Sequence, residues 1–126
     1  MRTRAWLILR LKGTNKVLVL KRSKCSRNKK QWDFIGGSTN RKRVNPRNLI
    51  RKESSEEIGF TPPYLVTKLV VVAKFSIYHY FISSISNKEL ENIQLSHEHT
   101  HYKLININKL RLLKNTHHSI RIFLKN

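Results

Sequence analysis

Three glutamates in the middle of the chain form the residue cluster best suited to chemistry. Glu53, Glu56 and Glu57 fall within five positions, although the 126-residue chain holds only seven acidic residues. Residues three and four apart share one face of a helix, where like charges repel by about 0.2–0.5 kcal/mol per pair. Carboxylate oxygens gathered in this way are ligands that hard divalent cations prefer. The spacing therefore predicts a metal site on a helix surface.

The helix that would present these glutamates has signals at both ends. Asn45 is a favourable N-cap, and Pro46 fits the first helical position. Gly59 can adopt the left-handed conformation that commonly ends a helix. Together these residues predict a helix over 46–58.

The apolar positions of this helix indicate which side faces the protein interior. Ile50, Ser54 and Ile58 recur every four residues and are expected to face the core. Glu53 and Glu57 lie next to that stripe, at the edge between core and solvent. A metal ion bound there would be partly dehydrated and still accessible to a substrate.

Residues 37–60 resemble the box of the Nudix hydrolase family, which reads Gly, five residues, Glu, seven residues, Arg-Glu-apolar-any-Glu-Glu-any-Gly-apolar. The specific part of the match is the second half, Lys-Glu-Ser-Ser-Glu-Glu-Ile-Gly-Phe at 52–60. The preceding residues 32–37, Trp-Asp-Phe-Ile-Gly-Gly, are similar to the strand and diglycine turn that lead into the family's box.

The chain departs from the family pattern at three places. Lys52 replaces the box arginine, which weakens the fixed-geometry bracing of a carboxylate. Ser54 stands where the family has an apolar core residue. The loop between Gly37 and Pro46 is one residue longer than usual, so the family's first glutamate falls near Val44 and its carboxylate is absent.

The resemblance implies an α/β fold, the Nudix-type α/β/α sandwich with a mixed β-sheet, in a single Nudix-like domain over residues 1–126. It implies hydrolysis of the diphosphate (acid anhydride) bond in a nucleoside diphosphate linked to another group, X, with Mg²⁺ or Mn²⁺ as cofactor. The metal ligands it implies are the Gly37 carbonyl, Glu53, Glu56 and Glu57.

A further glutamate near the C-terminus fits the same resemblance. Nudix enzymes often carry a late-loop glutamate ahead of a Tyr-basic-apolar strand, and Glu98 ahead of residues 102–105 is similar. Glu53 or Glu98 could take the proton from water, and Glu57 would complete the catalytic carboxylates. Lys52 would orient a neighbouring glutamate.

The segment around Glu98 leaves a second interpretation open. His97, His99 and His101 alternate, and alternate residues of an extended segment point the same way, so a zinc site of three imidazoles is conceivable. An ordinary surface loop is the third interpretation of this segment.

Two basic loops lie before and after the diglycine turn. The first, residues 21–30, holds six positive charges, and the second occupies the loop that lost the box glutamate. Cations there could hold substrate phosphates by charge-assisted hydrogen bonds, although solvated connections without a function are the alternative. The phosphate-binding residues expected from the two loops are Arg22, Lys24, Arg41, Lys42 and Arg43.

The composition limits the partners and the compartment. A net charge of +19 at pH 7 predicts attraction to nucleotides, RNA or DNA, unless a lysine-rich proteome alone explains it. The single Cys25 excludes a disulfide framework, and no stretch approaches about 20 apolar residues. No signal peptide is recognisable. We therefore expect a cytoplasmic protein without a membrane partner, in the host cytoplasm if the source is a virus or phage.

The remaining elements complete the expected α/β layers. Strands are predicted at 5–11, 16–21, 32–35, 64–75 and 76–85, and short helices at 108–113 and 116–123. The continuous apolar run at 69–73 is typical of a strand buried on both faces. Tyr78 and Tyr80 share one face of their strand, where core packing is favoured over base stacking. Residues 86–92 are predicted to be a polar turn.

Three functions stay open at this point. The first is a metal-dependent pyrophosphohydrolase acting on a small nucleotide, such as a nucleoside triphosphate, a dinucleoside polyphosphate or a nucleotide sugar. The second is an RNA 5′-end pyrophosphohydrolase or decapping enzyme whose basic loops track the phosphate backbone. The third is a basic nucleotide- or RNA-binding module with weakened catalysis, because the first box glutamate is missing.

Overall fold

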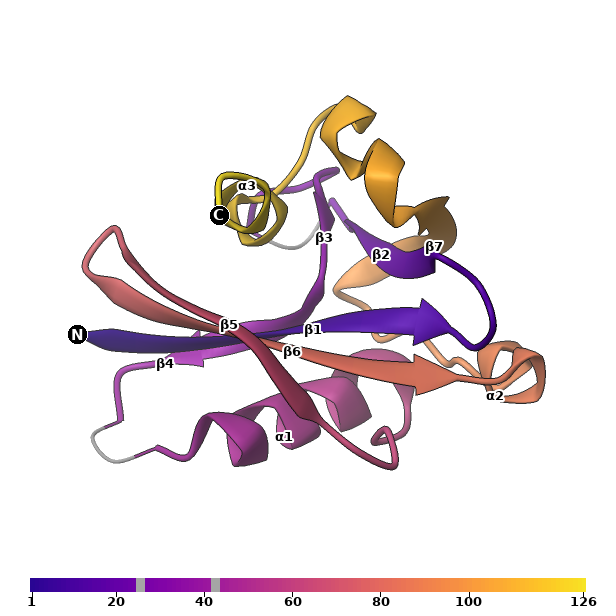
Figure 1. Ribbon diagram of the computed structural model, residues 1–126, viewed down its shortest axis with the longest axis horizontal. Helices are drawn as coiled ribbons and strands as arrows, with labels where there is room; N and C mark the ends of the chain where they lie inside the picture. Colours follow the sequence, from indigo (N-terminus) through magenta and orange to yellow (C-terminus); the bar gives the residue numbers. More distant parts are fainter. Residues whose placement is uncertain (25–26, 42–43) are drawn as a thin grey trace.

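The computed structural model describes residues 1–24, 27–41 and 44–126, so Cys25, Lys42 and Arg43 lie outside the described residues. Within them a seven-stranded mixed sheet has helices against both faces (Figure 1). The strands are β1 (Arg2–Leu11), β2 (Lys16–Arg22), β3 (Trp32–Asp33), β4 (Ile35–Thr39), β5 (Val66–Ala73), β6 (Ser76–Ile85) and β7 (His99–Asn106). The helices are α1 (Pro46–Ile58), α2 (Asn87–Glu91), the 3₁₀ helix η1 (Ile107–Leu112) and α3 (His118–Leu124). The expected α/β/α sandwich with a mixed sheet is confirmed.

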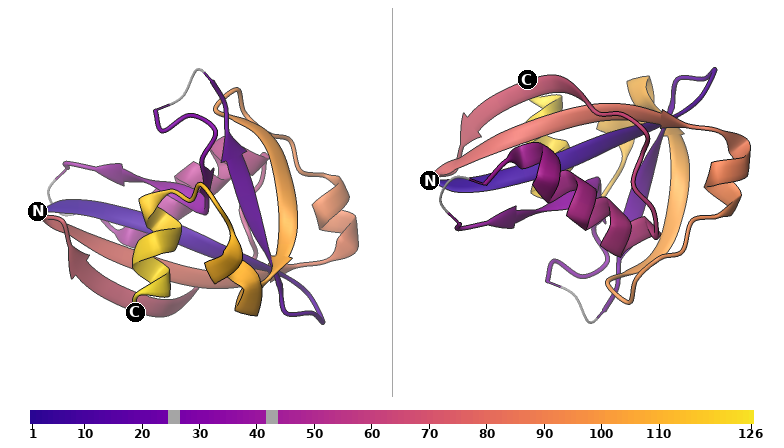
Figure 2. Two further views of the ribbon diagram at one scale, coloured as in Figure 1. Left: turned by 90° about the horizontal axis from the view of Figure 1, so that it is seen from above. Right: turned by 90° about the horizontal axis from the view of Figure 1, so that it is seen from below.

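Strand β1 is central to the sheet. It pairs in parallel with β6 and antiparallel with β4 and β2. Beyond these, β5 pairs antiparallel with β6, and β2 pairs antiparallel with β3 and β7. Gly36 and Gly37 lie within β4 and pair with Trp6 and Ala5 of β1, so the diglycine turn expected from the sequence is part of a strand. Strand β4 lies alongside β1, where α1 crosses the sheet (Figure 2).

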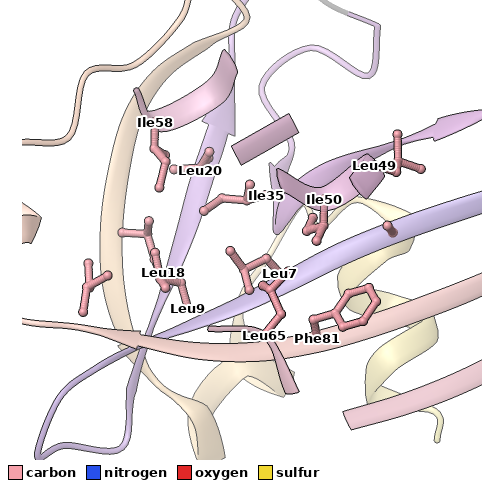
Figure 3. Packing of buried hydrophobic residues seen from close by; sticks show 12 residues of the cluster. Leu7, Leu9, Leu18, Leu20, Ile35, Leu49, Ile50, Ile58, Leu65 and Phe81 are labelled. Atoms are coloured by element: carbon pink, nitrogen blue, oxygen red, sulfur yellow. The ribbon is translucent and has the colours of Figure 1, made fainter. Parts of the chain in front are cut away.

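Two hydrophobic clusters hold the layers together, one on each face of the sheet. Leu7 and Leu9 of β1 pack with Ile50 of α1 on one face, as Figure 3 shows. Trp6 and Ile8, which alternate with them, belong to the second cluster. That cluster also includes residues of η1 and α3. Because β1 is buried on both faces, its side chains position α1 and α3 relative to each other.

Helix α1 has the predicted bounds. The Asn45 side chain accepts a hydrogen bond from the Arg47 amide at 2.9 Å, and Gly59 ends the helix at φ 86°. Ser54 is fully buried, and its hydroxyl donates to the Phe60 carbonyl at 2.8 Å. A polar residue is accepted at this core position because its hydroxyl is hydrogen-bonded.

Three local predictions were wrong. Strand β5 is not buried on both faces: Val72 is 64% exposed, because β5 is an edge strand. The expected polar turn at 86–92 contains α2, which begins with a capping box between Ser86 and Glu89. The strand expected at 32–35 is divided between β3 and β4. In each case tertiary packing or a local cap outweighed the average pattern of residue types.

The prediction of core packing for Tyr78 and Tyr80 agrees with the structure. Both side chains are fully buried, their rings stack on each other with centroids 6.3 Å apart, and the Tyr80 hydroxyl donates to the Ser119 carbonyl. None of the helices in the described ranges is long and apolar enough to cross a lipid bilayer.

Shortening a buried side chain of β1 should lower the free energy of unfolding more than the same change at an exposed position. Leu7 is fully buried and Leu112 is 62% exposed. Leu7→Ala should lower the free energy of unfolding by about 2–5 kcal/mol, because a cavity remains. Leu112→Ala should change it by less than about 0.5 kcal/mol. Urea unfolding followed by circular dichroism measures both, and equal losses would contradict the central role of β1.

Candidate active site

Gly36 and Gly37 bring the backbone of β4 into contact with β1 and α1. Gly36 has φ 152°, and an added Cβ would lie 2.0 Å from the Ala5 carbonyl oxygen. An added Cβ at Gly37 would lie 2.7 Å from the Glu53 carboxyl carbon. Gly36 therefore requires glycine, whereas a side chain at position 37 would displace the Glu53 carboxyl group. The consequence is a backbone segment lying directly against a glutamate of α1.

Glu53 and Glu57 form a hydrogen-bonded pair of carboxyl groups beside Gly36 and Gly37. Glu57 is 3% exposed, and its Oε2 accepts a hydrogen bond from the Gly36 amide at 3.2 Å. Two carboxyl groups can hydrogen-bond to each other only if one of them carries a proton. The pair therefore behaves as a coupled unit when no cation is bound between its members.

The environment raises the pKa of both carboxyl groups. Burial raises the pKa of Glu57 well above its usual range, and the negative charges of Asp33 and Glu53 act in the same direction. Burial also raises the pKa of Glu53, partly offset by its hydrogen bond with Glu57. Like charges that are buried together favour protonation or the binding of a cation.

A buried polar network lies under the pair. Asp33 is fully buried and accepts hydrogen bonds from Arg22 Nη1 at 2.7 Å and from His99 Nε2 at 3.1 Å. His99 Nε2 also lies 3.9 Å from Glu57 Oε1. Sequence analysis missed Asp33 and this role of His99. The available signal was an acidic residue between Trp32 and Phe34, in a strand that otherwise reads as apolar.

The structure does not bring all the expected ligands together. Glu56 is exposed, and its carboxylate lies 3.8 Å from Lys52 Nζ. This is the one carboxylate that the Lys52 ammonium reaches within 4 Å in the described part of the chain. Glu98 is exposed and lines the same cavity as Glu53 and Gly37, and its negative charge contributes to the raised pKa of Glu53.

The three histidines do not form a zinc site. His99 is buried against Asp33, whereas His101 is exposed and its Nδ1 lies 2.8 Å from the Thr100 hydroxyl. Within residues 1–24, 27–41 and 44–126, no group of three or more His, Cys, Asp or Glu side chains is close enough to hold a metal ion. The pairing of β7 with β2 is irregular at this point, which interrupts the alternation that the prediction assumed.

Two cavities meet at Glu53 and Ser38. The larger, about 450 Å³, contains Gly37 and Glu98, and we call it the arginine–histidine pocket after its other lining residues: Arg4, Trp6, Arg22, Arg27, Asn28, Gly36, His117 and His118. The smaller, about 320 Å³, contains Arg41, Val44 and Lys52. Of the expected phosphate-binding residues, Arg22 and Arg41 thus lie beside Glu53.

Lys24 is placed one step further away. It lines a separate cavity of about 270 Å³ together with Lys21, Lys30 and Arg22. Arg22 therefore connects this basic surface with the arginine–histidine pocket. Lys42 and Arg43 fall outside the described residues.

Neutralising Glu57 should make the metal-free protein more stable at neutral pH. The pKa of Glu57 in the folded protein is raised above 4.5. Its contribution to the free energy of unfolding is therefore fully present below pH 4.5 and is lost as pH rises through the folded-state pKa. A glutamine side chain does not titrate, so the unfolding free energy of Glu57→Gln minus that of wild type should increase above pH 4.5. Urea unfolding in EDTA between about pH 4 and pH 8 measures it.

The matched control is Glu91→Gln, which makes the same chemical change at an exposed position of α2. Its unfolding free energy should follow that of wild type across the range. A pH-independent difference between Glu57→Gln and wild type would contradict the raised pKa.

Comparison with known proteins places this chain in a family. The chain matches the family described as NUDIX domain over residues 1–126. None of the curated proteins compared with the chain matches it.

Several solved structures share the fold. A MutT protein from Methanosarcina mazei Go1 has a TM-score of 0.68 at 21% identity, covering 98% of this chain and 89% of its own. An Ap4A hydrolase from C. elegans, solved as a binary complex, has a TM-score of 0.68 at 20% identity, with 99% and 96% covered. The E. coli dihydroneopterin triphosphate pyrophosphohydrolase has a TM-score of 0.65 at 16% identity, with 98% and 95% covered. The chain therefore belongs to the Nudix hydrolase family, whose members act on nucleoside diphosphate derivatives.

Proposed function

We propose that the chain is a divalent-metal-dependent pyrophosphohydrolase that cleaves a nucleoside diphosphate linked to a group X. The observation that carries this proposal is the pairing of Glu53 with the buried Glu57 against the two glycines of β4. Two carboxyl groups with raised pKa values in one buried place are stabilised by a cation. The names of the similar structures, which include a hydrolase of Ap4A and a triphosphate pyrophosphohydrolase, support the same reaction class.

The donor set fits Mg²⁺ or Mn²⁺. Glu53, Glu57 and the Gly37 carbonyl would hold the ion, and Glu56 and Glu98 are exposed, so a change of side-chain rotamer could add either carboxylate. Mg²⁺ usually binds through one or two carboxylates plus water and substrate phosphates, so the family's first box glutamate is not indispensable. A bound ion would neutralise diphosphate charge and lower the pKa of water.

The remaining residues supply proton transfer and substrate binding. Hydrolysis forms a bond between a water oxygen and phosphorus and breaks the bridging P–O bond, whose electron pair leaves with the second phosphate. Glu53 or Glu98 takes the proton of the water, because both line the larger cavity. Lys52 holds Glu56, and Arg22 and Arg41 bind phosphate oxygens from the two cavities.

Removing either paired carboxylate should abolish most turnover. We expect Glu53→Gln and Glu57→Gln to lower kcat/KM by about 10²–10⁴-fold, the range for losing a catalytic proton-transfer group. The assay is release of phosphate or pyrophosphate with Mg²⁺ or Mn²⁺ from nucleoside triphosphates, dinucleoside polyphosphates, nucleotide sugars and 5′-triphosphorylated or capped RNA. Mg²⁺ should also raise the Tm of wild type more than that of Glu53→Gln.

Glu91→Gln is again the control and should retain wild-type kcat/KM. If wild type releases no product from any substrate with either metal but still binds nucleotide or RNA, the hydrolase proposal is wrong. The protein would then be a binding module built on a hydrolase fold.

An RNA 5′ end is a second candidate substrate, favoured by the basic surface next to the site. Lys21, Lys24 and Lys30 line a cavity that Arg22 connects to the arginine–histidine pocket. No carboxylate lies within 4 Å of these three lysines in the described part of the chain. An RNA with its 5′ phosphates beside Glu53 could therefore continue across positive charges that no carboxylate neutralises.

This candidate predicts a steeper salt dependence than a small nucleotide would show. Counterion release gives a slope of about −0.7 per phosphate contact on single strands. Changing Lys24 and Lys30 together to Gln should reduce the slope of log KM for 5′-triphosphorylated RNA against log salt by about 1–1.5. The same change at Lys12 and Lys109 is the matched control. If the two pairs of substitutions reduce the slope equally, the attraction is a general effect of charge, and RNA does not follow the surface formed by Lys21, Lys24 and Lys30.

A further inference from the structure

The arginine–histidine pocket contains side chains that the reaction described above does not use. Arg4 and Trp6 come from β1, and His117 and His118 come from the start of α3, which lies on the sheet face away from α1 (Figure 2). Glu53 lines the same pocket. A substrate whose diphosphate lies beside Glu53, and which extends into this larger of the two cavities, places another part of itself near these four residues.

Arg4 is anchored with its terminal groups left available. Its Nε donates to the Ser76 hydroxyl at 3.1 Å, and its guanidinium carbon lies 5.5 Å from the centroid of the Tyr78 ring. Within the described residues, its two terminal nitrogens have no hydrogen-bond partner. An arginine held in this way presents two N–H groups at a fixed position, which suits a phosphate or carboxylate.

His117 presents a neutral donor. Its Nδ1 accepts a hydrogen bond from the Ser119 amide at 3.1 Å, so a neutral ring must carry its proton on Nε2. Burial, the neighbouring His118 and nearby arginines lower the pKa of His117 to about 2, so the ring is neutral at pH 7. His118, whose pKa is lowered to about 4 mainly by burial, lies with Nδ1 3.0 Å from the Tyr78 hydroxyl.

Trp6 adds a buried donor without an acceptor. Its Nε1–H has no hydrogen-bond partner in the described part of the chain. An unsatisfied buried donor costs about 1–3 kcal/mol, so such a group needs an explanation. Because this nitrogen is itself buried, a ligand oxygen would provide the missing acceptor once the pocket wall shifts enough to uncover it.

The lining favours a phosphate over a nucleoside. A base presents donors and acceptors together and is normally held against an exposed aromatic or apolar face. The large apolar side chain in this pocket, Trp6, is 3% exposed and offers no such face. Apart from the carboxyl groups of Glu53 and Glu98 in the same pocket, the groups without partners are N–H donors, which match the acceptor-only oxygens of a phosphate.

We propose that the arginine–histidine pocket binds a phosphate group of X through Arg4, Trp6 and His117. The substrate is then a nucleoside diphosphate extended by further phosphate, such as a nucleoside triphosphate or a dinucleoside polyphosphate, and not a nucleotide sugar. This assignment rests on the proposed hydrolase function, because it requires the diphosphate to lie beside Glu53. This phosphate is terminal in a nucleoside triphosphate and internal in a dinucleoside polyphosphate. The pocket recognises the phosphate oxygens, which both substrates have.

Binding of tripolyphosphate without metal tests the pocket independently of catalysis. Isothermal titration in EDTA and about 150 mM NaCl, where long-range charge attraction is screened, compares wild type with Arg4→Met and Arg10→Met. Arg10 is the matched control because it lies on β1 but lines a different cavity, with Gly13, Thr14 and Asn15. We expect Arg4→Met to weaken binding at least tenfold and Arg10→Met to weaken it less than twofold. Equal weakening would mean general charge attraction and overturn the proposal.

A spectroscopic readout in the unaltered pocket guards against misfolding of the Arg4 variant. The chain has two tryptophans, and Trp32→Phe identifies the indole N–H resonance of Trp6 in a ¹⁵N–¹H spectrum. Tripolyphosphate should shift this resonance in wild type, and adenosine should not. A shift with adenosine alone would assign the pocket to a nucleoside and overturn the proposal.

Turnover decides the substrate class. Arg4→Met should lower kcat/KM at least tenfold for a nucleoside triphosphate or a dinucleoside polyphosphate and less than twofold for ADP-ribose. An equal loss with ADP-ribose would overturn the assignment of X. If wild type hydrolyses no substrate, the proposed function fails and the assignment of X fails with it, whereas tripolyphosphate binding would still establish the phosphate site.

Discussion

The side chain of Glu57 is buried between α1 and the two glycines of β4, and the arrangement of the site depends on how its carboxyl group is held there. The Gly36 amide donates to it, Glu53 shares a hydrogen bond with it, and the charge of Asp33 raises its pKa. An isolated buried carboxylate would be strongly unfavourable. The contacts are possible because neither Gly36 nor Gly37 has a side chain, so the backbone of β4 can touch both β1 and α1. A bound divalent cation would relieve the remaining repulsion.

The layers of the fold hold β4 and α1 in the positions that this contact requires. Strand β1 is buried on both faces, which sets α1 on one side of the sheet and α3 on the other. The same strand supplies the Ala5 carbonyl that limits Gly36 to glycine, and the Arg4 and Trp6 side chains that line the arginine–histidine pocket. The carboxylates and the N–H donors consequently occupy one cavity although they come from separate layers.

Charge is divided unevenly around the site. The net charge is +19, yet Glu53 and Glu98 place acidic side chains in the lining of the larger cavity. Arg22 is tied to the buried Asp33 and so keeps a positive charge next to these carboxylates in a fixed position. An ion and a phosphate chain can therefore bind at neighbouring points, each facing charge of opposite sign.

The sequence by itself determined features that depend on neighbouring residues. The bounds of α1 follow from Asn45, Pro46 and Gly59, and helical spacing put Glu53 and Glu57 at the edge of its core-facing side. The box, with its diglycine turn, was enough to predict the family and the sandwich. These features could be predicted because caps, helical period and glycine conformations are set within a few residues along the chain.

Only the tertiary structure decided which distant groups meet. Asp33 and His99 are 66 positions apart and join under Glu57, and Trp6 meets His117 and His118 through the packing of α3 on the sheet. The sequence spacing predicted that Glu56 would be a metal ligand like Glu53 and Glu57, but its exposed carboxylate lies near Lys52. The apolar run of β5 gave no sign that the strand lies at an edge. Strand order and helix placement arise from long-range burial, which local patterns do not encode.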